Sequence, residues 1–282
     1  MNITRPKLIS DMLWHYRRNL NLMRRDNGKF IRAQEVRMEK KIDAILKKQM
    51  RWVADGVKNV PGLSNNGVHY DRNTLDDQIS AMLSGMPGKT DLTETILIYS
   101  GVLMDKGANS IIRTSELRKF GISFTLKHPA AIKFLSNKKT LELSNGRGNI
   151  DSRTKASIKA ILLDAISEGK SYTATAQLIK AQGEHGVFSY ARAELIAVRE
   201  AGVAYEYGKQ TPLKEFIAKN PDRQIKKNWN TSGDNDVTPE CQQNQDVSPI
   251  GFNETFPNDG AQQTAPRSGN PRCRCWTTYE II

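Results

Sequence analysis

Cysteine, aromatic residues and long apolar runs are all scarce in this chain of 282 residues. It has three cysteines, an odd number that argues against a secreted disulfide framework. Aromatic residues make up 7% and hydrophobic residues 38% of the sequence, which predicts modest cores in a largely helical molecule. No apolar run approaches the roughly 18 residues of a membrane span, and the opening MNITRPKLISDML lacks the apolar block of a signal peptide. We therefore expect a protein that is made in the cytosol, stays soluble and has no membrane partner.

Positive charge, by contrast, is abundant and unevenly distributed. The net charge is +12, and residues 1–60 hold fifteen Lys or Arg against six Asp or Glu, an excess of nine in about a fifth of the chain. Such a segment can bind nucleic acid or an acidic protein surface, and the alternative is a solvated basic helix. The side chains that we assign to DNA contact are Arg17, Arg18, Arg24, Arg25, Lys40, Lys41, Lys47 and Lys48. Binding through them should weaken steeply with salt.

Two helices are predicted in the basic segment, over residues 7–24 and 29–55. In the second, a packing seam recurs at alternating four- and three-residue steps, at Met38, Ile42, Ile45, Gln49 and Trp52. The seam is short, so we expect it to dock on another helix rather than to build a long coiled coil. Residues 56–73 are rich in Gly, Asn and Pro and are predicted to be a linker.

Five further helices are predicted after the linker, over residues 74–84, 91–113, 152–168, 172–182 and 189–208. Ser171 is the expected N-cap of the fourth helix and Gly183 its expected end. The fifth helix carries small residues at four- and three-residue steps, which favour close helix–helix approach. These are Ala193, Ala197, Ala201 and Ala204. Residues 122–126 are too short a segment to assign to a helix or a strand.

After Pro212 the character of the sequence changes. Asn, Gln, Gly and Pro separate short apolar pieces, which is typical of a small, loop-rich α+β module. The predicted organisation is a basic helical arm over residues 1–55, a linker over 56–73, a helical body over 74–210 and this module over 211–282. The fold class that follows is α+β and predominantly α-helical.

All three cysteines lie inside the C-terminal module. Cys241 follows a Pro-Glu pair, and Cys273 and Cys275 belong to a Cys-Arg-Cys sequence. Zinc prefers four thiolate or imidazole ligands, so three thiols could supply part of such a shell. None of the four histidines lies in the module, and an aspartate or a more distant histidine would have to complete the shell. We favour reduced cysteines packed in a small core and expect no cofactor, with a zinc site as the alternative.

Two pairs of residues are assigned structural roles. Trp229 and Trp276 flank the module and are expected to form its core, because aromatic rings bury the most area in so short a segment. Arg199 and Glu200 are expected to dock the module onto the helices as an ion pair. The alternative role of Glu200, as a catalytic acid, is disfavoured because no second carboxylate, base or nucleophile converges on it by spacing.

Five segments follow one another along the chain: GISFTLKHPAAIKFL, EGKSYTATAQLI, RAELIAVREAGVAYEYGK, KNWNTSGDNDVTPEC and NPRCRC. In order and spacing they resemble the phage head morphogenesis family, the minor head proteins similar to phage Mu protein F, over roughly residues 90–282. Two positions depart from the family pattern. Thr238 stands where the family often has a cysteine, and Asn270 stands where it often has a histidine. These departures weigh against a zinc site more than against the fold.

The resemblance implies a structural virion protein rather than an enzyme. Members of the family associate with the portal vertex and enter the assembling procapsid. We therefore expect a non-enzymatic minor head protein, located in the virion inside the phage head or procapsid and in the host cytoplasm during assembly. Its expected partners are the portal protein, other head or scaffolding proteins, and double-stranded DNA. Two alternatives stay open, a nucleic-acid-binding protein that acts through the basic arm and a metal-dependent nuclease or other effector.

Overall fold

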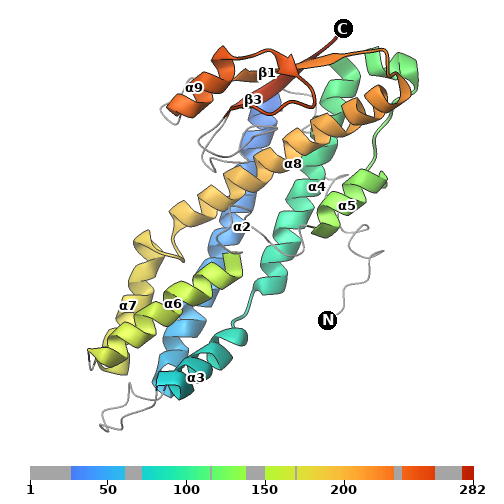
Figure 1. Ribbon diagram of the computed structural model, residues 1–282. Helices are drawn as coiled ribbons and strands as arrows, with labels where there is room; N and C mark the ends of the chain where they lie inside the picture. Colours follow the sequence, from blue (N-terminus) through green and yellow to red (C-terminus); the bar gives the residue numbers. More distant parts are fainter. Residues whose placement is uncertain are drawn as a thin grey trace. The chain divides into compact units, whose positions relative to one another are not determined.

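The described part of the chain is predominantly helical with a small antiparallel sheet, which confirms the predicted fold class. Figure 1 shows the fold as a computed structural model. The structure describes residues 27–60, 72–114, 116–137, 150–168, 170–231, 237–257 and 275–282. The helix predicted over 7–24 lies outside these ranges, and so do Arg17, Arg18, Arg24 and Arg25. None of the described helices is long and apolar enough to cross a membrane.

The chain divides into two compact units. We call the first the sheet unit; it comprises Met1–Arg37, Ile96–Asn137 and Leu195–Ile282. The second, the helical unit, comprises Met38–Thr95 and Lys138–Glu194. Three long helices contribute to both units: α2 (Asn27–Gly56), α4 (Lys89–Thr114) and α8 (Tyr190–Lys219). The boundary predicted between residues 210 and 211 falls inside α8.

The helical unit is built on the second half of α2, which confirms the helix predicted over 29–55. Met38 and Ile42 of the predicted seam are fully buried, and Ile45 and Gln49 are nearly so. The remaining elements of this unit are η2 (Val57–Asn59), α3 (Arg72–Ser84), α6 (Ile150–Ser167) and α7 (Tyr172–His185). Helix α6 contacts both α3 and α7. Within the predicted linker, Val57 and Val60 are buried, so its first residues belong to the packed structure.

Helix α7 begins as predicted but ends later. The Ser171 hydroxyl accepts a hydrogen bond from the Ala174 amide at 3.2 Å, which confirms the predicted N-cap. The predicted end at Gly183 is wrong, because the helix continues to His185 and its C-cap is Gly186. A β-carbon at Gly183 would lie 2.7 Å from the Met50 sulfur. The glycine therefore provides space for a neighbouring side chain rather than a helix stop.

The core of the sheet unit combines helices with a stretch of irregular chain. Helix α4 is followed by η3 (Glu116–Phe120) and by α5 (Pro129–Asn137), a helix that the sequence analysis did not predict. Between them, residues 122–126 form neither a helix nor a strand, but Ile122, Phe124 and Leu126 alternate inward. The buried side chains of this core are Leu97, Met104, Ala108, Ile112, Leu117, Ile122, Phe124, Leu126, Ala131, Leu135, Leu213, Phe216 and Ile225.

Helix α8 runs well past the predicted end at residue 208. It continues through Pro212 to Lys219. A proline in a helix interior removes one hydrogen bond and costs about 3 kcal/mol. Leu213 and Phe216 follow it and are buried in the core, where each contributes roughly 1.5–3 kcal/mol by leaving water. This burial offsets the cost of the proline and holds the helix together.

The C-terminal module contains three strands and a short helix, as an α+β module requires. Strand β1 (Ile225–Asn230) lies in the middle of the sheet, between β2 (Ile250–Gly251) and β3 (Trp276–Ile281). Both pairings are antiparallel, and β1 pairs with β3 along its whole length, from Ile225 opposite Ile281 to Asn230 opposite Trp276. Helix α9 (Pro239–Asp246) contacts β1. Its N-cap is Thr238, whose hydroxyl accepts a hydrogen bond from the Cys241 amide.

Candidate functional site

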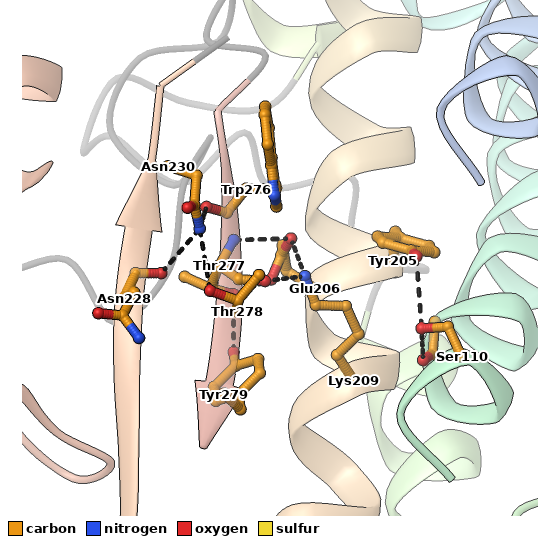
Figure 2. A network of polar contacts seen from close by, with 11 residues as sticks. Ser110, Tyr205, Glu206, Lys209, Asn228, Asn230, Trp276, Thr277, Thr278 and Tyr279 are labelled. Atoms are coloured by element: carbon orange, nitrogen blue, oxygen red, sulfur yellow. Dashed lines mark hydrogen bonds and ion pairs between the residues drawn. The ribbon is translucent and has the colours of Figure 1, made fainter. Parts of the chain in front are cut away.

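Charged residues of α8 meet the last strand in the interior of the sheet unit. Glu206 and Lys209, one turn apart on α8, are only 3% and 4% exposed. The Lys209 ammonium donates hydrogen bonds to the Glu206 carboxylate at 2.7 Å and to the Thr277 carbonyl oxygen at 2.5 Å. The Thr277 hydroxyl donates to the same carboxylate, and the Thr277 amide lies 3.4 Å from it. Figure 2 shows these side chains converging on β3 from the helix.

This ion pair occupies the place of a neighbouring strand. Gln224 and Ile282 exchange both backbone hydrogen bonds across the β1–β3 ladder. Since backbone groups along a strand point to alternate sides, the amide and carbonyl of Thr277 face away from β1. There the carboxylate of Glu206 accepts from the amide and the ammonium of Lys209 donates to the carbonyl. The pair thereby supplies the acceptor and the donor that a fourth strand would supply.

Aromatic rings enclose the pair and keep water away from it. The Lys209 ammonium lies 5.3 Å from the centre of the Tyr205 ring and 5.7 Å from that of Tyr279. The Tyr279 hydroxyl is hydrogen-bonded to the Thr277 hydroxyl at 2.9 Å. Burial, together with the nearby Glu206 carboxylate, raises the pKa of Tyr279. Its phenol therefore stays neutral at physiological pH and adds no second negative charge beside Glu206.

Helix α8 is held against α4 by two glycines. A β-carbon placed on Gly208 would lie 2.0 Å from the Met104 carbonyl oxygen, and one on Gly107 would lie 2.1 Å from the Tyr205 carbonyl oxygen. Real β-carbons do not approach backbone oxygens so closely. Each glycine therefore allows the backbone of the other helix to approach its own. The Tyr205 hydroxyl donates to Ser110 of α4 at 3.4 Å (Figure 2). The predicted small residues Ala197, Ala201 and Ala204 are fully buried on the same helix, but the closest contacts are made by the glycines.

Two of the cysteines lie in a small core of their own. Cys241 of α9 and Cys275, just before β3, are buried in one cluster with Trp229 and Phe256. The two rings meet edge to face, with centres 5.1 Å apart. Trp229 is 2% exposed, which confirms its predicted place in the core of the module. The packing agrees with the favoured interpretation that these cysteines serve a hydrophobic core.

The part of the chain that the structure describes supplies only some of the ligands that a zinc ion needs. There, no three His, Cys, Asp or Glu side chains gather as a metal ion would require. Cys241 and Cys275 alone supply two of the four ligands that zinc needs, and aromatic rings surround them. Cys273, the third predicted ligand, lies outside the described residues, so the zinc site stays a prediction.

Trp276 is not in the core, where the sequence analysis placed it. Its side chain is 43% exposed. Side chains along a strand alternate between faces, and Thr277 is the residue of this pair that faces α8. Trp276 therefore lies on the opposite face of the sheet. The Asn230 side chain on the neighbouring strand donates to the Trp276 carbonyl and to the Thr278 hydroxyl.

The other predicted site residues divide between the two units. Arg199 and Glu200 are buried on α8 in the sheet unit, and the ion pair predicted for them stays a prediction. Glu206 and Lys209 make a contact that fastens β3 to α8. In the helical unit, α2 exposes the four lysines that we assigned to DNA contact. These are Lys40, Lys41, Lys47 and Lys48.

The described residues form a predominantly helical α+β fold, in which a buried ion pair fastens a small C-terminal sheet to a long helix. Residues 156–278, from within α6 to within β3, match the model of the family described as phage Mu protein F like protein. Over this region the chain is similar to the phage head morphogenesis family, the family that its motifs indicated. Neither the curated proteins nor the solved structures that were compared give a match.

Proposed function

We propose that this protein is a minor head protein of a phage, which acts in head morphogenesis at the portal vertex inside the procapsid. The observation that carries the proposal is the family match over residues 156–278, which covers most of α6, all of α7 and α8, and the sheet as far as the first half of β3. The match supports other head proteins as partners. The portal protein and scaffolding proteins are the partners that we propose within that group, and the virion and the host cytoplasm during assembly are the proposed locations.

The proposed role is structural rather than catalytic. Glu206 and Lys209 satisfy each other and the edge of β3, and both are buried. A catalytic acid or base has to reach the proton that it transfers on a substrate. The burial of this charged pair therefore supports a part in holding the module on α8. We propose no cofactor.

The protein composition of assembled particles tests the proposed head role. Purified virions and procapsids should contain this protein at low copy number beside the portal protein, as measured by quantitative mass spectrometry. Affinity capture of the portal protein from infected cells should retain it. The matched control is capture with a tail protein of the same phage, which should not. Absence from both virions and procapsids would refute the head role.

We further propose that the protein contacts packaged DNA through basic residues of α2. Lys40, Lys41, Lys47 and Lys48 are exposed there, and their charges favour phosphate. A protein that binds DNA but is missing from particles would instead be a nucleic-acid-binding protein acting outside the virion. The two measurements, particle composition and DNA affinity, separate these functions.

A further inference from the structure

One face of α2 in the helical unit is exposed and almost uniformly basic. Between residues 40 and 51, the exposed side chains belong to five cations and one alanine. They are Lys40, Lys41, Ala44, Lys47, Lys48 and Arg51. The opposite face carries the buried seam of Met38, Ile42 and Ile45. Packing of the buried seam therefore orients the cations toward solvent. We call this exposed face the basic face.

The cations of the basic face form two rows. With about 100° between successive residues of an α-helix, Lys40, Lys47 and Arg51 fall within about 20° of one line along the helix. Lys41 and Lys48 fall on a second line, about 80–100° further round the helix. Ala44 lies between the two lines. The face therefore has a low centre bordered by long, positively charged side chains.

Lys47 and Lys48 of the basic face each take part in an ion pair. Lys47 contacts Asp43 at 2.8 Å, and Lys48 lies 3.9 Å from Asp91. Both lysine side chains are about half exposed or more. Exposed pairs of this kind contribute little to stability, so the lysines can exchange them for phosphate groups.

The shape of the basic face fits the major groove of double-stranded DNA. An α-helix with its side chains is about 10–12 Å across, which matches the major groove at about 12 Å and exceeds the minor groove at about 6 Å. A helix lying lengthwise in the major groove would direct one row of cations to the phosphates of each strand. Ala44 would then face the base edges, where its methyl group offers no donor or acceptor to read a sequence.

Single-stranded nucleic acid fits this face less well. Proteins that bind single strands combine cations with aromatic side chains on which bases stack. The exposed side chains between residues 40 and 51 include no aromatic ring. The basic face offers phosphate contacts without a stacking surface, and such contacts carry no sequence information.

We infer that the basic face of α2, from Lys40 to Arg51, binds double-stranded DNA lengthwise in the major groove, through phosphates of both strands and without sequence preference. The inference rests on the proposed contact with packaged DNA and specifies the groove and the residues of that contact. Its tests use the full chain and are separate from the particle composition that tests the head role.

The first test compares two variants with the same change in net charge. The face variant carries Lys40→Gln, Lys41→Gln, Lys47→Gln and Lys48→Gln. The control variant carries Lys58→Gln, Lys127→Gln, Lys180→Gln and Lys226→Gln, four exposed lysines outside the basic face. Binding of a fluorescent 25-base-pair duplex is measured by anisotropy over a range of salt concentrations. Five phosphate contacts give a slope of log K against log salt of about −4.5, and the face variant should lose about 3.6 of the total slope. The control should keep nearly all of it.

The second test concerns the groove and the sequence. Ala44→Glu places a carboxylate between the two rows and should weaken binding at least about tenfold, equivalent to about 1.4 kcal/mol. Ala44→Gln is its uncharged control and should bind like the parent. A duplex with bulky substituents at the 5-position of its pyrimidines, which fill the major groove, should bind more weakly than the unmodified duplex. Two duplexes of unrelated sequence should bind equally.

Several outcomes would overturn the inference. Equal losses in the face and control variants would show a contribution of net charge alone. Tighter binding of the single strand than of the duplex, or indifference to the filled major groove, would remove the groove geometry. A protein found in virions whose face variant binds DNA normally keeps its head role and loses this inference. A protein absent from particles loses the head role even if the basic face binds as expected.

Discussion

Replacing Lys209 with methionine should destabilise the sheet unit severely. The substitution keeps most of the side-chain volume but removes the ammonium that neutralises Glu206 and donates to the Thr277 carbonyl. The Glu206 carboxylate would then stay buried without its counter-ion, and the Thr277 carbonyl oxygen would lose its donor. Removing one partner of a buried ion pair typically costs about 3–5 kcal/mol. We expect a loss in this range, and the loss should be concentrated at β3.

Hydrogen exchange of peptides from residues 275–282 provides a local measurement. If the amides of β3 exchange through opening of the sheet, a loss of 3–5 kcal/mol lowers their protection by roughly 150- to 4,000-fold. The denaturation midpoint in urea should fall as well. Changing both partners, with Glu206→Met added to Lys209→Met, should recover part of the loss because no uncompensated charge stays buried.

Lys219→Met on the same helix is the matched control. Lys219 contacts Glu215 at 2.7 Å, as Lys209 contacts Glu206, but its side chain is 55% exposed. Exposed pairs contribute about 0–1 kcal/mol, so this variant should be nearly as stable as the parent. Equal effects of the two substitutions, or a loss below about 1 kcal/mol for Lys209→Met, would refute the role assigned to the buried pair.

Two further predictions concern the sheet unit. Gly208→Ala should lower the thermal unfolding temperature by disrupting the contact between α8 and α4, because its β-carbon would lie 2.0 Å from the Met104 carbonyl oxygen. The control is Gly121→Ala, whose β-carbon would meet no atom within 4 Å. It should show only the effect of its backbone strain. Burial lowers the pKa of Lys227 to about 8, below the ordinary value of 10.5, so the unfolded chain binds more protons than the folded one between these values. Stability should therefore rise from pH 8 towards pH 10, and Lys227→Met should remove this rise in urea titrations at each pH.

Local chemistry made the helical elements predictable. The hydroxyl of Ser171 caps α7 as expected, and Met38 and Ile42 lie on the buried face of α2 that their spacing indicated. These features depend on neighbours within a few residues, which a sequence displays directly. Helix α5 also carries a local signal in the sequence. Pro129 is its first residue, a position where proline is favoured because no hydrogen bond is lost.

The contacts between distant segments could not be predicted in the same way. Pro212 marked a change of character in the sequence, but burial of Leu213 and Phe216 in the core decided that α8 continues through it. The place of Trp276 depends on strand register, and a shift of one residue reverses the face on which a side chain lies. The partnership of Glu206 and Lys209 with Thr277 spans about seventy residues and has no local signature.

The order of synthesis has a consequence for β3, the strand that Glu206 and Lys209 hold. Asn230 of β1 pairs with Trp276, 46 residues later in the chain. At about 5–20 residues per second, a ribosome needs roughly 2–9 s to synthesise that interval. Until then β1 lacks its long neighbour, and the ion pair on α8 has no strand to hold. Only a chain synthesised as far as β3 can close the sheet onto the helix, so a nascent chain cannot present a finished module to its assembly partners too early.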